Sequence, residues 1–214
     1  MGFTHTHKSE DMIVVIDYWM GNAQSVMNAL ESLGANAELT NDKKKISKAS
    51  HIILPGVGAF PTAMDNLKKL DLIDLLTEQV MENKKPFLGI CLGMQLLAKK
   101  GYEGEVRDGL GWIDGKVKKL EPNDKKLKIP HIGWNDVQCN TEKKIFKNSN
   151  PIQTFYFVHS YYADCKNQGI VAGTCDYGMK FAAVIEQDNI FGTQFHPEKS
   201  QKDGLDILGR FIKL

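Results

Sequence analysis

The fold of this chain is decided by one stretch, Phe87-Leu88-Gly89-Ile90-Cys91-Leu92-Gly93-Met94-Gln95. An apolar run ends at Cys91, and apolar residues at helical spacing follow it directly. The stretch therefore predicts a buried strand, a sharp turn at the cysteine and then a helix. Gly89 and Gly93 leave room for the strand and the helix to approach each other at that turn. Such a turn is a nucleophile elbow with a cysteine at its tip.

Upstream of this stretch, strand-like apolar runs alternate with helical patterns. We expect strands at residues 13–18, 36–39, 51–55 and 86–90. We expect helices after Asn22 up to Gly34, and at residues 62–70, 72–82 and 92–100. This alternation predicts an α/β fold with an open, mostly parallel sheet that is flanked by helices on both faces.

The second half of the chain has a different texture, because short strands and turns dominate it. Strands are expected at residues 109–112, 116–120, 132–135, 154–158, 170–174, 181–186 and 190–195, and a closing helix at 202–212. Without a repeat or a low-complexity linker, residues 12–214 are expected to form one domain with a strand-rich second half. Residues 1–11 are expected to be a disordered extension or a cloning remnant.

Composition limits the classes of function. The 214 residues are 25% charged and carry a net charge of +1, so no global field favours nucleic acid or an anionic membrane. No apolar run approaches the roughly 20 residues of a membrane-spanning helix. The 4 cysteines show no CxxC spacing, which predicts free thiols in a reducing cytoplasm. His5 and His7 are too few for a metal site, and no metal or other cofactor is expected.

The position of Cys91 favours a reactive thiol. The sulfur would lie above the sheet at the N-terminus of a helix, where the helix dipole and free N–H groups favour the thiolate. The N–H of Leu92 would then be placed to stabilise an oxyanion. Taken alone, however, glycines on both sides of a cysteine also fit a buried, inert cysteine at the end of a strand.

A candidate base follows a late apolar strand, in the segment Gln194-Phe195-His196-Pro197-Glu198-Lys199-Ser200. A nucleophilic thiol needs a base, and the base needs a partner that fixes its tautomer. His196 and Glu198 supply both, with Pro197 stiffening the turn between them. An exposed turn with no function is the alternative interpretation of this segment alone.

A glycine-rich loop, Pro55-Gly56-Val57-Gly58-Ala59-Phe60, follows another buried strand. Gly56 and Gly58 would let the peptide at Val57 flip and present its N–H to a substrate carbonyl. A phosphate-binding loop is the competing interpretation. It fails because no Gly-Lys-Ser/Thr follows the loop.

These signals occur together in the order of a known family. The chain resembles the class I (triad) glutamine amidotransferases, and among them the glutaminase subunits of imidazole glycerol phosphate synthase, from about residue 12 to residue 214. The motifs that carry this resemblance are Ile16-Asp17-Tyr18 with Gly21-Asn22, Pro55-Gly56-Val57-Gly58, Gly89-Ile90-Cys91-Leu92-Gly93-Met94-Gln95, Pro130-His131-Ile132-Gly133-Trp134-Asn135, Tyr156-Phe157-Val158-His159-Ser160-Tyr161 and Phe195-His196-Pro197-Glu198-Lys199-Ser200-Gln201. The resemblance implies a flavodoxin-like sheet.

The resemblance also implies roles for individual residues. Cys91 would form a γ-glutamyl thioester from glutamine, His196 would move the protons, and Glu198 would orient His196. The N–H groups of Val57 and Leu92 would form the oxyanion hole. Glutamine would be bound by Gly56, Gly58, Gln95, Ser160 and Tyr161. His159 could be mistaken for the base, but its buried strand and the lack of an adjacent carboxylate favour a packing role.

A partner is expected as well, since the glutaminase fold takes up the whole domain. By resemblance, the partner is a (β/α)8-barrel cyclase that receives ammonia through a shielded channel in a heterodimer and makes imidazole glycerol phosphate for histidine biosynthesis. Residues at that interface and at the channel mouth would be Gly21, Asn22, Trp134, Tyr156 and Lys199. Packing in the core is the alternative role for Trp134 and Tyr156.

Four departures from the family pattern leave a second pathway open. Trp19 stands where the histidine-pathway subunits have glycine, and Gln24 where a basic residue is common. Trp112 and Asp114 also depart from the pattern. A paralogue that supplies ammonia for amidine formation in surface-sugar synthesis is therefore an alternative. A stand-alone cysteine γ-glutamyl hydrolase or peptidase is disfavoured by Gln95, and a non-catalytic module by the intact triad.

Overall fold

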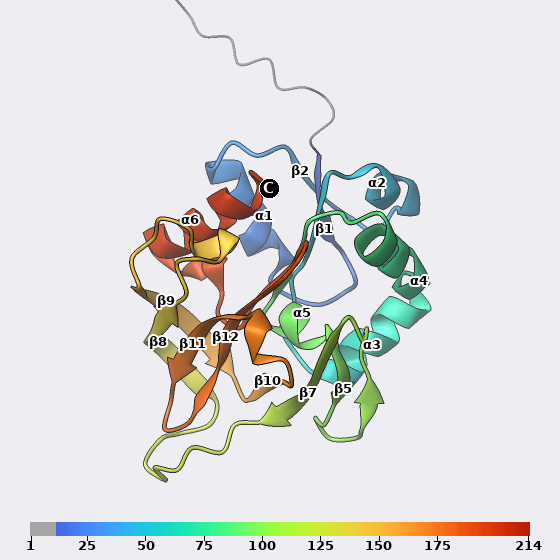
Figure 1. Ribbon diagram of the computed structural model, residues 1–214. Helices are drawn as coiled ribbons and strands as arrows, with labels where there is room; N and C mark the ends of the chain where they lie inside the picture. Colours follow the sequence, from blue (N-terminus) through green and yellow to red (C-terminus); the bar gives the residue numbers. More distant parts are fainter. Residues whose placement is uncertain (1–11) are drawn as a thin grey trace, which may run out of the picture.

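The computed structural model describes residues 12–214, so the extension expected at residues 1–11 lies outside the described residues. A large mixed sheet runs through the centre of the molecule (Figure 1). Its strands, in spatial order, are β2 (Ala37–Thr40), β1 (Ile13–Ile16), β3 (His51–Leu54), β4 (Phe87–Ile90), β13 (Ile190–Thr193), β12 (Lys180–Gln187), β11 (Val171–Asp176), β8 (His131–Cys139) and β9 (Ile152–His159).

The large sheet has a parallel half and an antiparallel half. All pairings from β2 through β1, β3 and β4 to β13 are parallel. All pairings from β13 through β12, β11 and β8 to β9 are antiparallel. Strand β13 therefore joins the two halves, although it is the last strand in the sequence. It brings the segment that contains His196 beside strand β4, which ends at Ile90, directly before Cys91.

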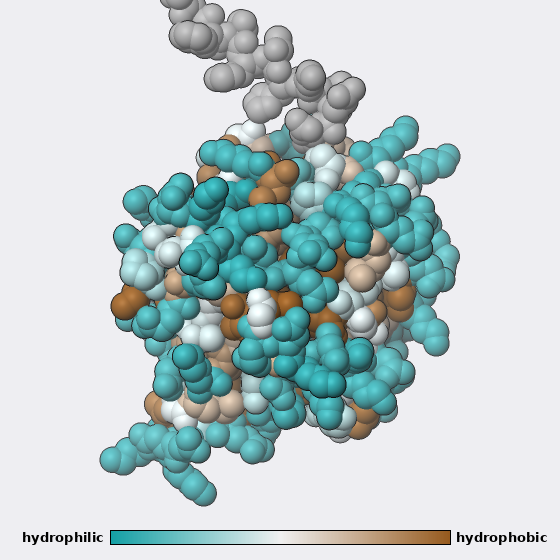
Figure 2. All heavy atoms as spheres, viewed as in Figure 1, coloured by the Kyte–Doolittle hydropathy of each residue, from teal (hydrophilic) through white to brown (hydrophobic). Residues whose placement is uncertain are grey.

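Helices cover both faces of the parallel half, as the alternation of elements predicts. Helices α1 (Ala23–Ser32) and α6 (Gln201–Phe211) lie on one face, and α2 (Lys43–Lys48), α3 (Phe60–Lys69) and α4 (Ile73–Thr77) on the other (Figure 1). Within β1, Ile13 and Val15 pack toward α1 and α6, while Val14 and Ile16 pack toward the other three helices. Two apolar cores thus enclose the sheet, and hydrophilic side chains cover most of the face shown in Figure 2.

A second, smaller sheet includes residues that were expected to be helical. The helix expected at residues 92–100 is wrong: α5 ends after Leu92–Gln95, and β5 (Ala98–Gly101) follows. Strand β5 pairs with β7 (Ile113–Lys119) and β6 (Arg107–Asp108), and β10 (Tyr161–Cys165) completes the sheet. The buried run Leu96-Leu97-Ala98 fits the end of a helix and a strand equally well, and the pairing with β7 decides between them.

Two further predicted elements differ from the structure. Residues 109–112 form a loop rather than a strand, because the N–H groups of Gly109, Leu110 and Gly111 bond to carbonyls of the α5–β5 segment. The helix expected at residues 72–82 is α4 followed by a π-helical turn, η1 (Glu78–Glu82). The remaining predicted strands and helices are found within a few residues of their expected bounds.

Candidate active site

Cys91 forms a sharp turn between β4 and α5, as its flanking glycines predict. Its backbone has φ 54° and ψ −104°, a conformation that non-glycine residues rarely adopt, and its N–H donates to the carbonyl of Thr193 over 2.7 Å. A Cβ on Gly93 would lie 1.8 Å from the carbonyl oxygen of Leu54, and one on Gly89 would lie 2.6 Å from the backbone of Gly93. Only glycine fits at these two positions, so the elbow depends on both.

His196 and Glu198 form a buried pair beside the elbow. The ring Nδ1 of His196 lies 2.8 Å from Oε1 of Glu198, and both side chains have 0% exposure. Since a carboxylate accepts hydrogen bonds, Nδ1 carries the proton, and Nε2 is left for another group. Burial acts to lower the pKa of His196, but its interactions with Cys91 and Glu198 outweigh burial and raise the pKa to about 10.

Asn22 also contacts this pair. Its Nδ2 donates to Oε1 of Glu198 over 2.6 Å, and it lies 3.1 Å from Nδ1 of His196. Asn22 has φ 78° at the N-terminus of α1, which directs its side chain toward the turn that carries Glu198. The sequence motif predicts Asn22 at the partner face and gives no indication of its contact with Glu198. An asparagine at the N-cap of a helix predicts a capping hydrogen bond, but the side chain of Asn22 makes none.

The glycine-rich loop is in a conformation that closes the predicted oxyanion hole. The N–H of Leu92 donates to the carbonyl of Gly56 over 3.4 Å, so the Gly56–Val57 peptide directs its oxygen, rather than the N–H of Val57, toward Leu92. Gly58 has φ 117°, and a Cβ on Gly56 would lie 2.2 Å from the hydroxyl of Tyr18. The loop is therefore tightly packed, yet glycine on both sides gives the peptide at Val57 freedom to rotate.

A cavity of about 320 Å³ opens in front of Cys91. Its lining residues are Val57, Gly58, Cys91, Leu92, Gln95, Glu103, Pro130, Val158, His159, Ser160 and Tyr161. The structure thus brings together seven of the residues expected around the substrate, and Gly56 adjoins them. Inside this cavity, Nε2 of Gln95 donates to the carbonyl of Tyr161 over 2.8 Å and to Oε1 of Gln194 over 3.1 Å. Both amide hydrogens are used, so Oε1 of Gln95 is left to accept a hydrogen bond.

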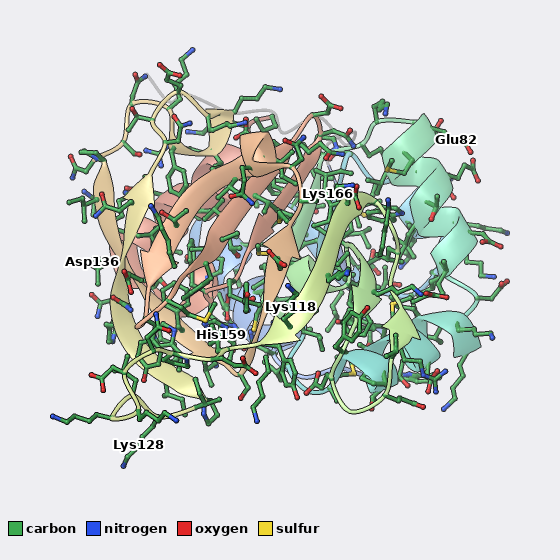
Figure 3. All side chains as sticks on the ribbon, turned by 60° about the horizontal axis from the view of Figure 1, so that its bottom comes forward. Glu82, Lys118, Lys128, Asp136, His159 and Lys166 are labelled. Atoms are coloured by element: carbon green, nitrogen blue, oxygen red, sulfur yellow. The ribbon has the colours of Figure 1, made fainter. Side chains whose placement is uncertain are left out.

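His159 lines this cavity, but its ring is paired with that of His131 rather than with Cys91. Its Nδ1 lies 2.8 Å from the carbonyl of Tyr161, and its Nε2 lies 3.0 Å from Nδ1 of His131. A carbonyl can only accept, so Nδ1 of His159 carries a proton and donates it to the carbonyl of Tyr161. In a neutral His159, Nε2 then accepts from Nδ1 of His131. Burial lowers the pKa of His159 to about 3 and that of His131 to about 4. In Figure 3 His159 lies inside the molecule, whereas Lys128 projects from it.

The buried histidine pair should make the fold sensitive to mild acid. The folded-state pKa values are lowered, so the unfolded chain binds more protons below pH ~6.5, and the stability that the pair contributes is lost as pH falls from there. We expect the free energy of unfolding to drop by up to about 2 kcal/mol per histidine between pH 6.5 and 5. Urea titrations at several pH values measure this drop. An unchanged free energy of unfolding, or ring signals of His131 and His159 that titrate near pH 6.5 in NMR spectra, would contradict it.

The residues expected at a partner interface do not line the cavity but lie close to the glycine-rich loop or to the segment that carries His196. Trp134 is 48% exposed, and its ring lies 5.9 Å from that of half-buried Tyr156, whose carbonyl accepts the N–H of His196. Lys199 is exposed next to Glu198. A Cβ on Gly21 would lie 2.9 Å from Val57, so Gly21 adjoins the glycine-rich loop. The alternative role of Trp134 as a core residue is excluded by its exposure.

Trp19, two residues before Gly21, has an unusual backbone conformation and an exposed side chain. It is 59% exposed and has φ 64°, the left-handed region that glycine favours. The glycine that the resemblance places here would fit the backbone without strain. Within residues 12–214, no helix is long and apolar enough to cross a bilayer, and no cluster of metal-ligating side chains is found.

The elbow at Cys91, the buried His196–Glu198 pair and the adjoining glycine-rich loop form the arrangement expected of a cysteine amidohydrolase on an α/β fold, and comparison with known proteins names the family. The model of the family described as glutamine amidotransferase class-I matches residues 14–214. The chain therefore belongs to the class-I glutamine amidotransferase family.

Relatives narrow this assignment. The chain is 49% identical over 203 residues to the imidazole glycerol phosphate synthase subunit HisH 1 of Campylobacter jejuni. The aligned residues cover 95% of this chain and 100% of that relative. It is 47% identical to HisH 2 of Pseudomonas aeruginosa, with the same coverage. It is also 47% identical to the imidazole glycerol phosphate synthase subunit HisH of Bacillus cereus, over 94% of this chain and 93% of that relative.

Solved structures support the fold. A glutamine amidotransferase structure matches with a TM-score of 0.72 at 18% identity, over 94% of this chain and 99% of the other. The structure of PurLQS from Thermotoga maritima matches with a TM-score of 0.71 at 18% identity, over 95% and 98% of the two chains. The predicted α/β fold with a flavodoxin-like sheet and a strand-rich second half is confirmed.

Proposed function

We propose that this chain is the glutaminase subunit of an imidazole glycerol phosphate synthase and supplies ammonia for histidine biosynthesis. The observation that carries the proposal is the contact of His196 with Glu198 beside Cys91, in a chain that is 49% identical to a HisH subunit over the full length of that relative. The surface-sugar alternative is not favoured, since these relatives are named as synthase subunits.

The geometry supports a thioester mechanism. The raised pKa of His196 favours an ion pair in which its Nε2 already holds the proton of Cys91, and the sulfur attacks the side-chain carbonyl carbon of glutamine. His196 then donates that proton to the departing nitrogen, and ammonia leaves with the γ-glutamyl group bound to the sulfur. Water, deprotonated by His196, attacks the thioester and releases glutamate. Glu198 holds the ring and stabilises its positive charge throughout.

Substrate binding follows from the polarity of the cavity. The free Oε1 of Gln95 suits the α-ammonium group of glutamine, and the backbone of Ser160 and Tyr161 lies in the same cavity. The loop conformation supports regulation of the chemical step. Rotation of the Gly56–Val57 peptide would remove its carbonyl from Leu92 and present the N–H of Val57 instead, so that two N–H groups face the oxyanion.

A partner subunit would use the ammonia. We infer that the partner is a (β/α)8-barrel cyclase in a heterodimer, and that it docks against the surface that contains Gly21, Asn22, Trp134, Tyr156 and Lys199. A shielded channel between the two subunits would keep the ammonia from being protonated by bulk water. The free cysteines Cys91, Cys139, Cys165 and Cys175 favour a reducing cytoplasm for the complex.

One experiment tests the proposed function. The chain is mixed with a barrel cyclase and the aminoimidazole ribonucleotide precursor, and glutamate and imidazole glycerol phosphate are followed. We expect glutamine hydrolysis to rise when the cyclase and its ligand are both present. A rise that occurs with an amidine-forming sugar enzyme and not with the cyclase would overturn the pathway assignment.

The contact between Asn22 and Glu198 gives a prediction. In Asn22→Ala the carboxylate loses a charge-assisted hydrogen bond and becomes free to turn away from His196, so we expect kcat for glutamine to fall roughly 10- to 100-fold. Steady-state glutamate release in the complex measures this. Gln24→Ala is the matched control, because its side chain bonds to Asn28 on the exposed side of the same helix. Equal activity of Asn22→Ala and wild type would show that Glu198 needs no second donor.

A further inference from the structure

A buried glutamine connects the proposed substrate anchor to the proposed nucleophile. Gln194 follows strand β13, and its side chain has no exposure. Its Oε1 accepts a hydrogen bond from Nε2 of Gln95 over 3.1 Å, and its Nε2 donates to the sulfur of Cys91 over 3.7 Å. One amide group therefore spans the distance between Gln95 and Cys91. The mechanism above gives it no role.

The direction of this chain of hydrogen bonds is fixed at one end by the backbone. The carbonyl of Tyr161 can only accept, so the atom of Gln95 that faces it must be the amide nitrogen. That nitrogen also faces Gln194, so the atom of Gln194 that receives its second hydrogen must be the amide oxygen. The nitrogen of Gln194 is consequently the end that faces the sulfur. Rotating either amide by 180° would place two donors or two acceptors against each other.

The carbonyl of Tyr161 is itself held firmly. It accepts the Nδ1 proton of His159 over 2.8 Å, and the other nitrogen of His159 accepts from His131. His131 in turn is stacked between Phe157 and Tyr177, with ring centroids 4.8 Å and 4.0 Å away. The neutral histidine pair thus keeps the carbonyl pointing at Gln95, and the polarity of the amides is set without any bound ligand.

We propose that Gln194 is a positioning residue for glutamine hydrolysis. Its carbonyl keeps the amide of Gln95 turned so that Oε1 of Gln95 faces the α-ammonium group of the substrate. Its N–H group stabilises negative charge on the sulfur of Cys91. A donor that faces a buried sulfur favours the thiolate over the thiol, because hydrogen bonds to charged groups are the stronger ones. The substrate role in this inference rests on the proposed function, but the sulfur contact does not.

Alkylation of Cys91 tests the sulfur contact directly. The variant Gln194→Met keeps the length of the side chain but has neither a donor nor an acceptor. Iodoacetamide labelling of the Cys91 peptide is followed by mass spectrometry from pH 5 to pH 10, in the absence of glutamine and partner. We expect the midpoint of the rate profile to move up by roughly one to two pH units. In the complex, we expect kcat to fall roughly 10-fold and KM to rise.

Two other variants separate the role of Gln194 from general packing. Gln153→Met is the matched control, because Gln153 is also a buried glutamine beside a thiol, that of Cys139 on the far part of strands β8 and β9. It should leave the Cys91 midpoint unchanged. Gln95→Met should raise KM, because the variant lacks the oxygen that faces the α-ammonium group of the substrate.

A further variant keeps the test open if Gln194→Met does not fold, as judged by circular dichroism and urea unfolding. Gln194→Glu keeps the size and still accepts from Gln95, but its ionised carboxylate faces the sulfur without a donor. We expect its midpoint to rise at least as far as that of Gln194→Met. An unchanged midpoint in either folded variant overturns the sulfur contact. If the wild-type chain does not hydrolyse glutamine together with the cyclase, the proposed function is overturned instead. The two failures can be told apart because the labelling experiment uses neither glutamine nor the cyclase.

Discussion

Cys91→Ala is expected to abolish glutamine hydrolysis, at least about 10⁴-fold, while synthesis from added ammonia by the partner continues. The methyl group of alanine cannot form the thioester, and the oxyanion loop and cavity alone leave little activity. Glutamate release with glutamine measures the hydrolysis by this chain. Product formation with an ammonium salt measures the synthesis by the partner separately.

The matched control for this variant is Cys175→Ala. Cys175 is buried in strand β11, and burial raises the pKa of its thiol to about 12, so it is inert at neutral pH. It should keep full glutamine turnover. Glutamate release by Cys91→Ala above the uncatalysed rate would show that another group is the nucleophile.

The second large effect is expected at Gly93. In Gly93→Ala the new Cβ would lie 1.8 Å from the carbonyl oxygen of Leu54, which belongs to the backbone of β3 and cannot move aside on its own. Helix α5 must therefore shift away from the sheet, and we expect a loss of about 3 kcal/mol or more in the free energy of unfolding, together with a loss of glutaminase activity. Urea unfolding and partner-dependent glutamate release measure these losses.

Gly209→Ala in helix α6 provides the contrast. A Cβ at Gly209 would meet nothing within 4 Å, so alanine should raise the free energy of unfolding by about 0.5–1 kcal/mol through its better helix propensity. A Gly93→Ala variant as stable as wild type would show that α5 and β3 are not held as closely as the structure places them.

The elbow and the parallel half of the sheet could be predicted because their signals are local. A buried parallel strand is a continuous apolar run, and glycines on both sides of Cys91 mark a close approach. Helix α2 was missed although Asp42 caps it, its side chain accepting from the N–H groups of Lys44 and Lys45. Three successive lysines, Lys43 to Lys45, are also typical of a solvated turn, and Ile46 is the one buried residue of this helix.

The connections within the site could be predicted less well, because they join residues far apart in the sequence. The pairing of His196 with Glu198 is local and was predicted. The contact of Asn22 with Glu198 joins α1 to the segment after β13, and no short-range pattern reports it. Gln194 was missed for a similar reason, since a polar residue in an otherwise apolar strand end carries no sign of the partners that it meets.

The register between β4 and β13 limits how this enzyme can be switched on. Thr193 pairs with Ile90, and each strand runs directly into its half of the site, Cys91 on one side and Gln194 and His196 on the other. Both halves are therefore parts of one rigid body, and no domain closure could bring them together or draw them apart. Under the proposed function, control would act instead on the glycine-rich loop that follows β3, where the carbonyl of Gly56 faces the N–H of Leu92. An idle subunit would thus hold Cys91 beside the His196–Glu198 pair, with the rotation of a single peptide still to come.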